Sequence, residues 1–392
     1  MKRPPSAPRL TLADLIPRAD RVSWGNLPGS RNVRLTYSGR AAIYQYLRGL
    51  RALGAMPAGR NTVLVPAFHC PNVVDPVVHA GFDVRFYAVD ERLRVDAEDF
   101  LRKLDGKIAA AIFIQYFGFP CMPAELVMAC RQAGATIIED CSHSFLQASP
   151  LRIACSGADA TTFSFWKLLP GGVGGGLLLG DADRETSPLR LSPPCIGDSL
   201  RRSNIALRQL LEDEIEVASR IRGRVRARPR QEPEPTPAVR RPAAEAYPYD
   251  PEASSWGMPR LMNRVLKCSD LSAVVTARRR NYQGYLSGLV PSSEMSPAFP
   301  DLPADVCPWG FPVILDRRGE RDYLIRAAGV PLFTFGEVLH PLLFDHHARE
   351  AEMLDRARYL SDRLLAFSIH QGLEAAAVWR FAEVVNGFVG AS

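Results

Sequence analysis

The sequence lacks the features that mark an exported or membrane-embedded protein. Its eight cysteines are scattered, with no CxxC pair and no regular framework, which is typical of reduced thiols in a cytosolic protein. No apolar run reaches the roughly 18 residues of a membrane span. The first residues, MKRPPSAPRLTLADL, contain no apolar signal core. We therefore expect a cytoplasmic protein that is neither exported nor bound to a membrane.

The sequence also has no strong excess of one charge. With 48 basic and 42 acidic residues, the net charge is only +6, and a nucleic-acid partner is not expected. The glycine run at 171–176 is neither a P-loop nor a dinucleotide fingerprint, because no GK[ST] and no suitable βα turn follow it. The run Asp345, His346, His347 does not predict a metal site either, since adjacent side chains point to different sides of an element.

Short apolar runs alternate with helical patterns through the first half of the chain. Strands are predicted at 62–66, 83–90 and 107–120, and helices at 71–80, 97–105 and 123–133. This alternation favours an open α/β sheet, and 392 residues are enough for two domains.

The segment from Ala135 to Gly176 concentrates the reactive residues. Two apolar β-branched runs, Ala135–Ile138 and Thr161–Phe165, are typical of buried strands. Glu139, Asp140 and His143 follow the first run, and Lys167 follows the second. Because ligands bind outside the carboxyl ends of strands in open α/β sheets, Asp140 and Lys167 are expected to face one pocket.

A carboxylate and a lysine in one buried pocket suit a pyridine cofactor. An amine attacks a carbonyl only when it is neutral, and burial lowers the pKa of lysine. A carboxylate keeps a pyridine nitrogen protonated, so that the ring acts as an electron sink. From these two residues alone, a buried Asp–Lys ion pair is the preferred interpretation.

The two motifs together resemble a known family. IIEDCSH followed by FSFWKLLPGGVGG is similar to the paired signature of the DegT/DnrJ/EryC1/StrS aminotransferases, which are fold-type I pyridoxal phosphate enzymes. The resemblance implies that Lys167 is the Schiff-base lysine, that Asp140 meets the pyridine nitrogen and that His143 lies near the ring hydroxyl. It also implies that Ser164 binds the cofactor phosphate.

Two further cofactor positions depart from the family pattern. The family has Ser-Gly-Thr before a helix, and its Gly and Thr positions touch the phosphate. Here the positions are Gly39 and Arg40, after the N-cap Ser38, so the Arg40 amide remains but the hydroxyl is lost. The aromatic that stacks on the ring in the family corresponds to Cys70. We expect His69 or Phe68 to take that role.

The resemblance extends over the rest of the chain. It implies a large domain with a mainly parallel seven-stranded sheet over residues 1–255, and a linking helix with a small C-terminal α+β domain over residues 256–392. Residues 184–254 are expected to form an insertion that is basic first and rich in proline later, and to be mobile. A homodimer is also implied, because fold-type I sites lie at a dimer interface.

The predicted function is pyridoxal 5'-phosphate-dependent amino transfer, from a donor such as glutamate to a keto-sugar linked to a nucleotide. Two alternatives stay open. One is a pyridoxal phosphate enzyme of another reaction type, such as carbon–carbon bond formation, elimination or decarboxylation. The other is a binding or regulatory protein that retains the fold without turnover. The sequence does not specify the acceptor.

Overall fold

The computed structural model describes residues 6–54, 59–180, 191–202, 204–205, 249–290, 292–345 and 350–389. His346, His347 and most of the basic, proline-rich insertion, residues 206–248, lie outside the described residues. Within the described part of the chain, no helix combines the length and apolar character needed to cross a bilayer.

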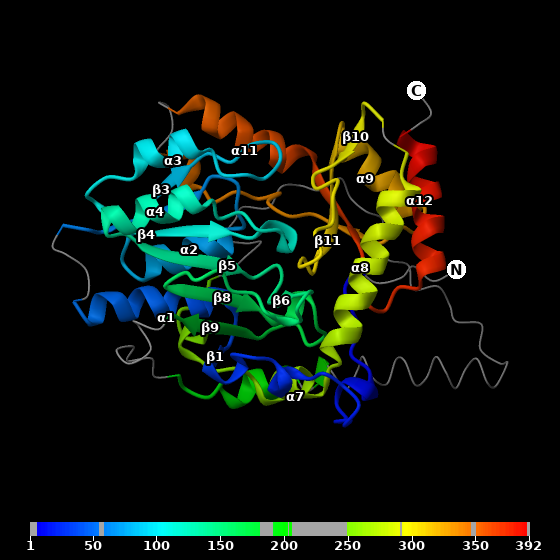
Figure 1. The fold of residues 1–392 in the computed structure, drawn as a ribbon, viewed down its shortest axis with the longest axis horizontal. Helices are drawn as coiled ribbons and strands as arrows, with labels where there is room; N and C mark the ends of the chain where they lie inside the picture. The colour runs from blue at the N-terminus through cyan, green and yellow to red at the C-terminus, as the bar shows by residue number, and fades with distance from the viewer. Residues whose placement is uncertain are drawn as a thin grey trace.

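A seven-stranded sheet forms the larger layer of the molecule (Figure 1). Its order is β1-β9-β8-β5-β4-β2-β3. The parallel strands are β2 (Thr62–Pro66), β3 (Asp83–Tyr87), β4 (Ile108–Ile114), β5 (Thr136–Cys141) and β8 (Ala160–Ser164). β9 (Gly175–Leu179) runs antiparallel to β8, and β1 (Val33–Thr36) pairs antiparallel with β9 at the edge of the sheet. The predicted mainly parallel seven-stranded sheet is confirmed.

Helices cover both faces of this sheet. The chain steps outward from β2 to β3, then inward from β3 to β4 and from β4 to β5. Right-handed crossovers therefore place α2 (Pro71–His79) on one face, and α3 (Ala97–Lys103) and α4 (Ala124–Ala133) on the other. α1 (Gly39–Ala52) packs against α2, β8 and β9. The central strands β2 and β4 are buried along their whole length, as double coverage requires.

The N-terminal arm packs on this same chain. Its short helical turns η1 (Leu12–Asp14) and η2 (Trp24–Asn26) lie against α7 (Arg260–Cys268), and η3 (Ser30–Asn32) leads into β1. The Trp24 ring packs edge-on against Phe165, with ring centroids 5.2 Å apart. These contacts form a second hydrophobic core directly beneath the segment that bears Lys167.

A smaller antiparallel sheet follows the long helix α8 (Leu271–Gly288), which runs between the two layers in Figure 1. Its order is β10-β11-β13-β12, with β10 (Met295–Pro297), β11 (Gly310–Leu315), β13 (Leu364–Ser368) and β12 (Leu332–Phe333). The helices of this part are α9 (Arg318–Ala327), α10 (Leu342–Asp345), α11 (Ala351–Arg363) and α12 (Ala375–Val389). The described chain also contains the short elements η4 (Tyr116–Gly118), η5 (Phe165–Lys167), η7 (Ala253–Ser255) and the hairpin of β6 (Leu146–Gln147) and β7 (Arg152–Ile153), and residues 196–202 are helical.

Candidate active site

The acidic pair at the end of β5 is divided between the two faces of the sheet. Successive residues of a strand point to opposite sides, so Glu139 and Asp140 serve different purposes. Glu139 is fully buried and accepts hydrogen bonds from Gln115 Nε2 and, at 3.0 Å, from the Ser156 amide. Asp140 instead lines a cavity of about 410 Å³. Glu139 is therefore a structural carboxylate, and Asp140 is the one that a ligand can reach.

Neighbouring groups hold the Asp140 carboxylate in place. Its Oδ1 accepts a hydrogen bond of 2.9 Å from the Ser142 amide and one of 3.3 Å from Thr162 Oγ1. Burial raises the pKa of Asp140, while the bonds from Ser142 and the charge of Lys167 oppose the rise. The carboxylate is fixed in orientation but poorly solvated, which favours binding of a positively charged partner.

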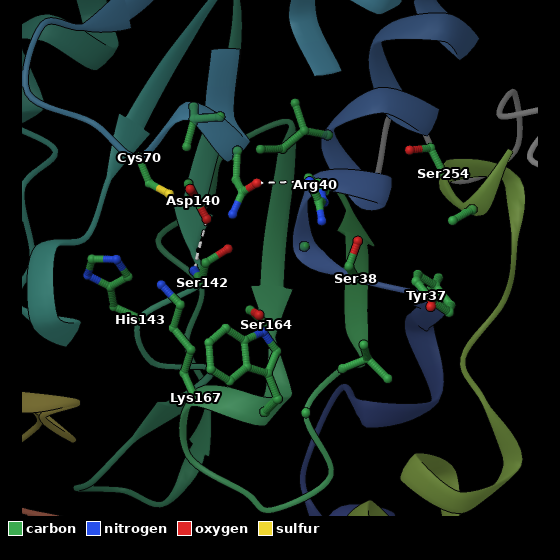
Figure 2. Close-up of a pocket in the computed structure, with 18 of the residues that line it drawn as sticks. Tyr37, Ser38, Arg40, Cys70, Asp140, Ser142, His143, Ser164, Lys167 and Ser254 are labelled. Carbon is green, nitrogen blue, oxygen red and sulfur yellow. Dashed lines mark hydrogen bonds between the residues drawn. The ribbon is translucent and has the colours of Figure 1, made fainter. Parts of the chain in front are cut away.

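Lys167 enters the same cavity from the next strand along the sheet. It ends the turn η5, which follows β8 directly, and its side chain points toward Asp140 and Cys70 (Figure 2). The Nζ atom lies 4.1 Å from the centroid of the Trp309 ring and 5.6 Å from that of Phe335. Burial lowers the pKa of Lys167 to about 8, with Cys70 and Asp140 opposing the shift. A larger fraction of this amine is thus neutral at ordinary pH than in an exposed lysine, and the neutral form is the nucleophile.

A buried arginine from α8 fixes the segment that bears Lys167. The Arg278 guanidinium donates hydrogen bonds to the carbonyls of Lys167 at 3.3 Å, Leu168 at 3.2 Å and Trp309 at 2.9 Å. Burial lowers the pKa of Arg278 to about 10, so the group remains charged near neutral pH. Arg278 therefore ties the lysine turn to the loop that holds the Trp309 ring against it. Nothing in the sequence distinguishes Arg278 from Arg279 and Arg280 except its position on the buried face of the helix.

His143 is held in one tautomer. Its Nδ1 accepts a hydrogen bond of 2.8 Å from the Phe117 amide. Burial lowers the pKa of His143 well below its usual value, and the charge of Lys167 adds to the effect. The ring is therefore neutral with its proton on Nε2, which makes Nε2 a hydrogen-bond donor. His143 lines the cavity beside Lys167, where a donor can meet an acceptor on a bound ligand.

The start of α1 forms the opposite side of the cavity. Ser38 caps the helix, because its hydroxyl accepts a hydrogen bond of 3.2 Å from the Ala41 amide. A Cβ atom placed on Gly39 would lie 2.7 Å from Ser142 Oγ and 3.4 Å from Ser164 Cβ, so only glycine lets these groups approach closely. The free amides at the positive end of the helix and two hydroxyl groups together suit an anion.

The glycine run after Lys167 is required by backbone geometry. Gly171 and Gly174 have φ values of 125° and 108°, which side chains rarely adopt. Added Cβ atoms would also meet the Met262 side chain, at 2.7 Å from Sδ for Gly171. This compact turn brings Gly172 and Val173 to the cavity wall.

Of the eight predicted cofactor residues, seven line the cavity: Gly39, Arg40, Cys70, Asp140, His143, Ser164 and Lys167. His69 does not. Its ring is fully buried, with Nδ1 3.0 Å from the Pro66 carbonyl oxygen and Nε2 accepting a bond of 3.1 Å from the His340 amide. The expectation that His69 could stack on a ligand ring is therefore wrong. Phe68 is buried against Tyr116 and Phe335 and does not line the cavity either.

Several cavity residues had no local sequence signal. Trp166 and Phe335 provide the aromatic surface, and Ser142, Arg201 and Arg202 provide further polar groups. Phe335 comes from the loop after β12, far along the chain from the motifs, and its ring packs edge-on against His143 with centroids 4.5 Å apart. Ser142 alone was within reach of sequence reasoning, since it lies two residues after Asp140.

Comparison with known proteins agrees with the motifs. Residues 29–192 match the DegT/DnrJ/EryC1/StrS aminotransferase family. GDP-perosamine synthase from Vibrio cholerae is 31% identical over 118 residues, which are 29% of this chain and 32% of that protein. The matched part thus spans about a third of the length of this relative.

Solved structures extend the likeness to the whole fold. The sugar aminotransferase CalS13 from Micromonospora echinospora superposes with a TM-score of 0.60 at 18% identity, covering 92% of this chain and 89% of that one. PseC from Helicobacter pylori, an aminotransferase involved in the biosynthesis of pseudoaminic acid, gives a TM-score of 0.63 at 13% identity, covering 92% and 87%. The shared architecture is the fold-type I scaffold. The resemblance seen in the motifs is confirmed: the segment that matches the DegT/DnrJ/EryC1/StrS aminotransferase family, residues 29–192, contains all eight predicted cofactor residues.

Proposed function

We propose that this protein is a pyridoxal 5'-phosphate-dependent aminotransferase that moves an amino group from an amino acid such as glutamate to a nucleotide-linked keto-sugar. The single observation that supports this most is the cavity in which Lys167, with a pKa of about 8, faces the buried Asp140. The sugar substrate is supported by the names of the relatives, GDP-perosamine synthase and the sugar aminotransferase CalS13.

The residues of the cavity fit the cofactor. Lys167 would bind its aldehyde carbon, and Asp140 would pair with its pyridine nitrogen. The amides of Gly39 and Arg40, with the hydroxyls of Ser142 and Ser164, would hold its phosphate at the start of α1. The donor His143 Nε2–H would face the ring hydroxyl. The residues that would face the cofactor ring differ most from the family pattern. Cys70 stands where an aromatic residue is expected, and Trp166 and Phe335 provide the aromatic surface of the cavity instead.

Each group of this chain then has a definite task. When bound, the cofactor supplies an electron sink that stabilises negative charge at the substrate's α-carbon. Asp140 would keep the pyridine nitrogen protonated, because an adjacent carboxylate favours the charged form. Lys167 would act as the general base that accepts the proton from the α-carbon of the amino donor. The rings of Trp309 and Phe335 lie beside the Lys167 amine and provide part of the apolar surroundings that lower its pKa.

The test is direct. Purified protein loaded with pyridoxal 5'-phosphate is reduced with borohydride and digested, and the modified peptide is identified by mass spectrometry. We expect the label on Lys167; a label on a different lysine contradicts the assignment. Transfer of ¹⁵N from labelled glutamate to a nucleotide-linked keto-sugar then separates amino transfer from other chemistry. If cofactor binds and no keto acceptor gains ¹⁵N, the alternative reaction types become the better explanation.

The oligomeric state, location and domain boundaries of the protein are part of this proposal. We expect a homodimer in the cytoplasm, with the large domain over 1–255 and the linking helix and small domain over 256–392. Sedimentation of the purified protein measures the assembly, and a monomer that retains full activity would contradict the dimer.

A further inference from the structure

The segment 191–202 places two arginines beside the start of α1. Arg201 and Arg202 both line the cavity, on the same wall as Tyr37 and Ser38. Figure 2 shows Tyr37 and Ser38 on one side of the cavity and Lys167 and His143 on the other. Arg202 lies over the Tyr37 ring, so it belongs to the Tyr37 side of the cavity, next to the helix terminus that suits an anion.

A buried carboxylate orients both arginines. The Asp198 side chain is only 6% exposed, and it accepts hydrogen bonds of 2.7 Å from Arg202 Nε, 2.8 Å from Arg201 and 2.9 Å from the Tyr37 hydroxyl. Burial opposes ionisation of Asp198, but the bonds from Arg202, Arg201 and Tyr37 outweigh it and lower its pKa. The carboxylate therefore stays ionised and is fully occupied within the protein.

The cluster keeps a positive charge after this pairing. Two guanidinium groups and one carboxylate leave a net charge of +1. The Arg202 side chain is only 14% exposed, and its Nε and one terminal nitrogen are engaged by Asp198 and Tyr37. Its ring-stacked position over Tyr37, 4.9 Å from the centroid, fixes its plane. A rigid, poorly hydrated guanidinium of this kind is well suited to a phosphate group.

The remaining charges of the cavity favour the same ligand. The cations Arg40, Lys167, Arg201 and Arg202 face two carboxylates, Asp140 and Asp250. The Arg40 guanidinium donates to Asn72 at 2.9 Å, so it is directed away from the helix terminus toward α2. Asp250 Oδ1 already accepts from the amides of Glu252 and Ala253. Asn72 is neutral, so the charge of Arg40 and the net charge of +1 of the Arg201–Arg202–Asp198 cluster both remain at the end of the cavity near α1.

We propose that Arg202, oriented by Asp198 and Tyr37 and assisted by Arg201 at the rim, forms a phosphate subsite at the start of α1. This inference rests on the proposed function, because it assumes that a pyridoxal phosphate or a substrate phosphate enters this cavity. The phosphate of the cofactor is the favoured ligand, since the hydroxyl expected at position 40 is absent and the Arg40 side chain turns to Asn72. A phosphate of the nucleotide-linked substrate is the other source of the same chemistry.

The experiment removes the charge from the protein and the phosphate from the ligand separately. Apoprotein is titrated with pyridoxal 5'-phosphate and with pyridoxal, and binding is followed by absorbance. Arg202→Gln is expected to weaken binding of pyridoxal 5'-phosphate by about 10- to 100-fold, the range for one hydrogen bond between charged groups, and to leave pyridoxal binding within about twofold of wild type. Arg202→Lys should recover part of the loss. Arg131→Gln, which removes an equal charge from the exposed surface of α4, should change neither affinity.

Other outcomes are equally informative. If Arg202→Gln leaves both cofactor affinities unchanged but weakens binding of a nucleoside diphosphate to the loaded protein, the subsite serves the substrate. Equal weakening of pyridoxal and pyridoxal 5'-phosphate would overturn the proposal, because Arg202 would then only support the fold. No effect on any of the three ligands would overturn it as well. If wild-type protein binds no pyridoxal 5'-phosphate at all, the proposed function fails rather than this inference.

Discussion

The low pKa of Lys167 predicts how fast the protein captures its cofactor at each pH. Burial lowers this pKa from 10.5 to about 8, and Cys70 and Asp140 oppose the shift. Only the neutral amine attacks an aldehyde. At pH 7 the neutral fraction is about 9% for a pKa of 8 and about 0.03% for a pKa of 10.5, so the structure predicts about 300-fold more reactive amine than in an ordinary lysine.

The assay is the initial rate of absorbance change when apoprotein is mixed with pyridoxal 5'-phosphate between pH 6 and pH 10. The same series with N-acetyl-lysine amide in place of protein gives the titration of the cofactor and of an ordinary lysine amine, so the ratio of the two rates isolates the pKa shift of Lys167. We expect this ratio to be constant below about pH 8 and to fall by up to about tenfold per pH unit between pH 8 and pH 10, as the ordinary amine loses its proton. A ratio that stays constant from pH 6 to pH 10 would refute the argument that burial lowers the pKa of this amine.

The same shift makes a prediction about stability, with a definite sign. The folded state releases the proton of Lys167 near pH 8 and the unfolded state only near pH 10.5, so burial of the charged lysine destabilises apoprotein below pH 8. The cost is fully present at pH 7 and disappears as the pH rises to 10.5. Lys167→Met apoprotein should therefore be more stable than wild type by about 2–3 kcal/mol at pH 7, and by much less at pH 10.5. Urea unfolding at both pH values measures this, and equal gains at both would contradict it.

Three other substitutions test the remaining parts of the site. Asp140→Asn should fold normally and slow α-proton removal by orders of magnitude, as measured by exchange of the glutamate α-hydrogen; near-normal exchange would argue against a pyridine partner. Gly39→Ala places a Cβ atom 2.7 Å from Ser142 Oγ and 3.1 Å from the Phe163 carbonyl, so cofactor affinity should fall about tenfold and unfolding free energy by about 1–3 kcal/mol. Arg278→Met removes the hydrogen bonds to the Lys167 turn and should lower the unfolding free energy by about 2–4 kcal/mol, whereas Arg131→Met on the exposed surface of α4 should cost less than about 1 kcal/mol.

The large sheet was predictable because its strands carry a continuous apolar signal. The predicted strand 62–66 matches β2 residue for residue, and β4 begins at Ile108, one residue after its predicted start. β1 was not among the predicted strands. Only four residues long and antiparallel at the edge, it is held by pairing with β9 and not by an apolar run of its own. Tertiary pairing of this kind leaves no periodicity in the sequence.

The core of the site was predictable for a related reason. Asp140 and Ser164 lie at the ends of β5 and β8, and His143 and Lys167 follow within a few residues; parallel strands with their carboxyl ends at one edge bring such residues together. His69 follows a strand end as well, and there the rule failed. The Pro66 carbonyl and the His340 amide provide partners for both ring nitrogens, and the ring stacks on Phe86 instead of facing the cavity. Whether a strand-end side chain faces a pocket depends on partners that are distant in sequence.

The residues that surround the Lys167 amine could not be predicted from the sequence. Trp309 and Phe335 pack around the Lys167 amine from loops of the small sheet, and Arg278 ties one of these loops to the lysine turn. None of these three residues belongs to a motif. Trp309 and Phe335 provide apolar surface, which many residues at many positions can provide. Yet the pKa of about 8 depends on this enclosure, since burial is the dominant cause of the shift. The local motifs thus determine which groups react, and the packing of distant segments determines that Lys167 is reactive at neutral pH.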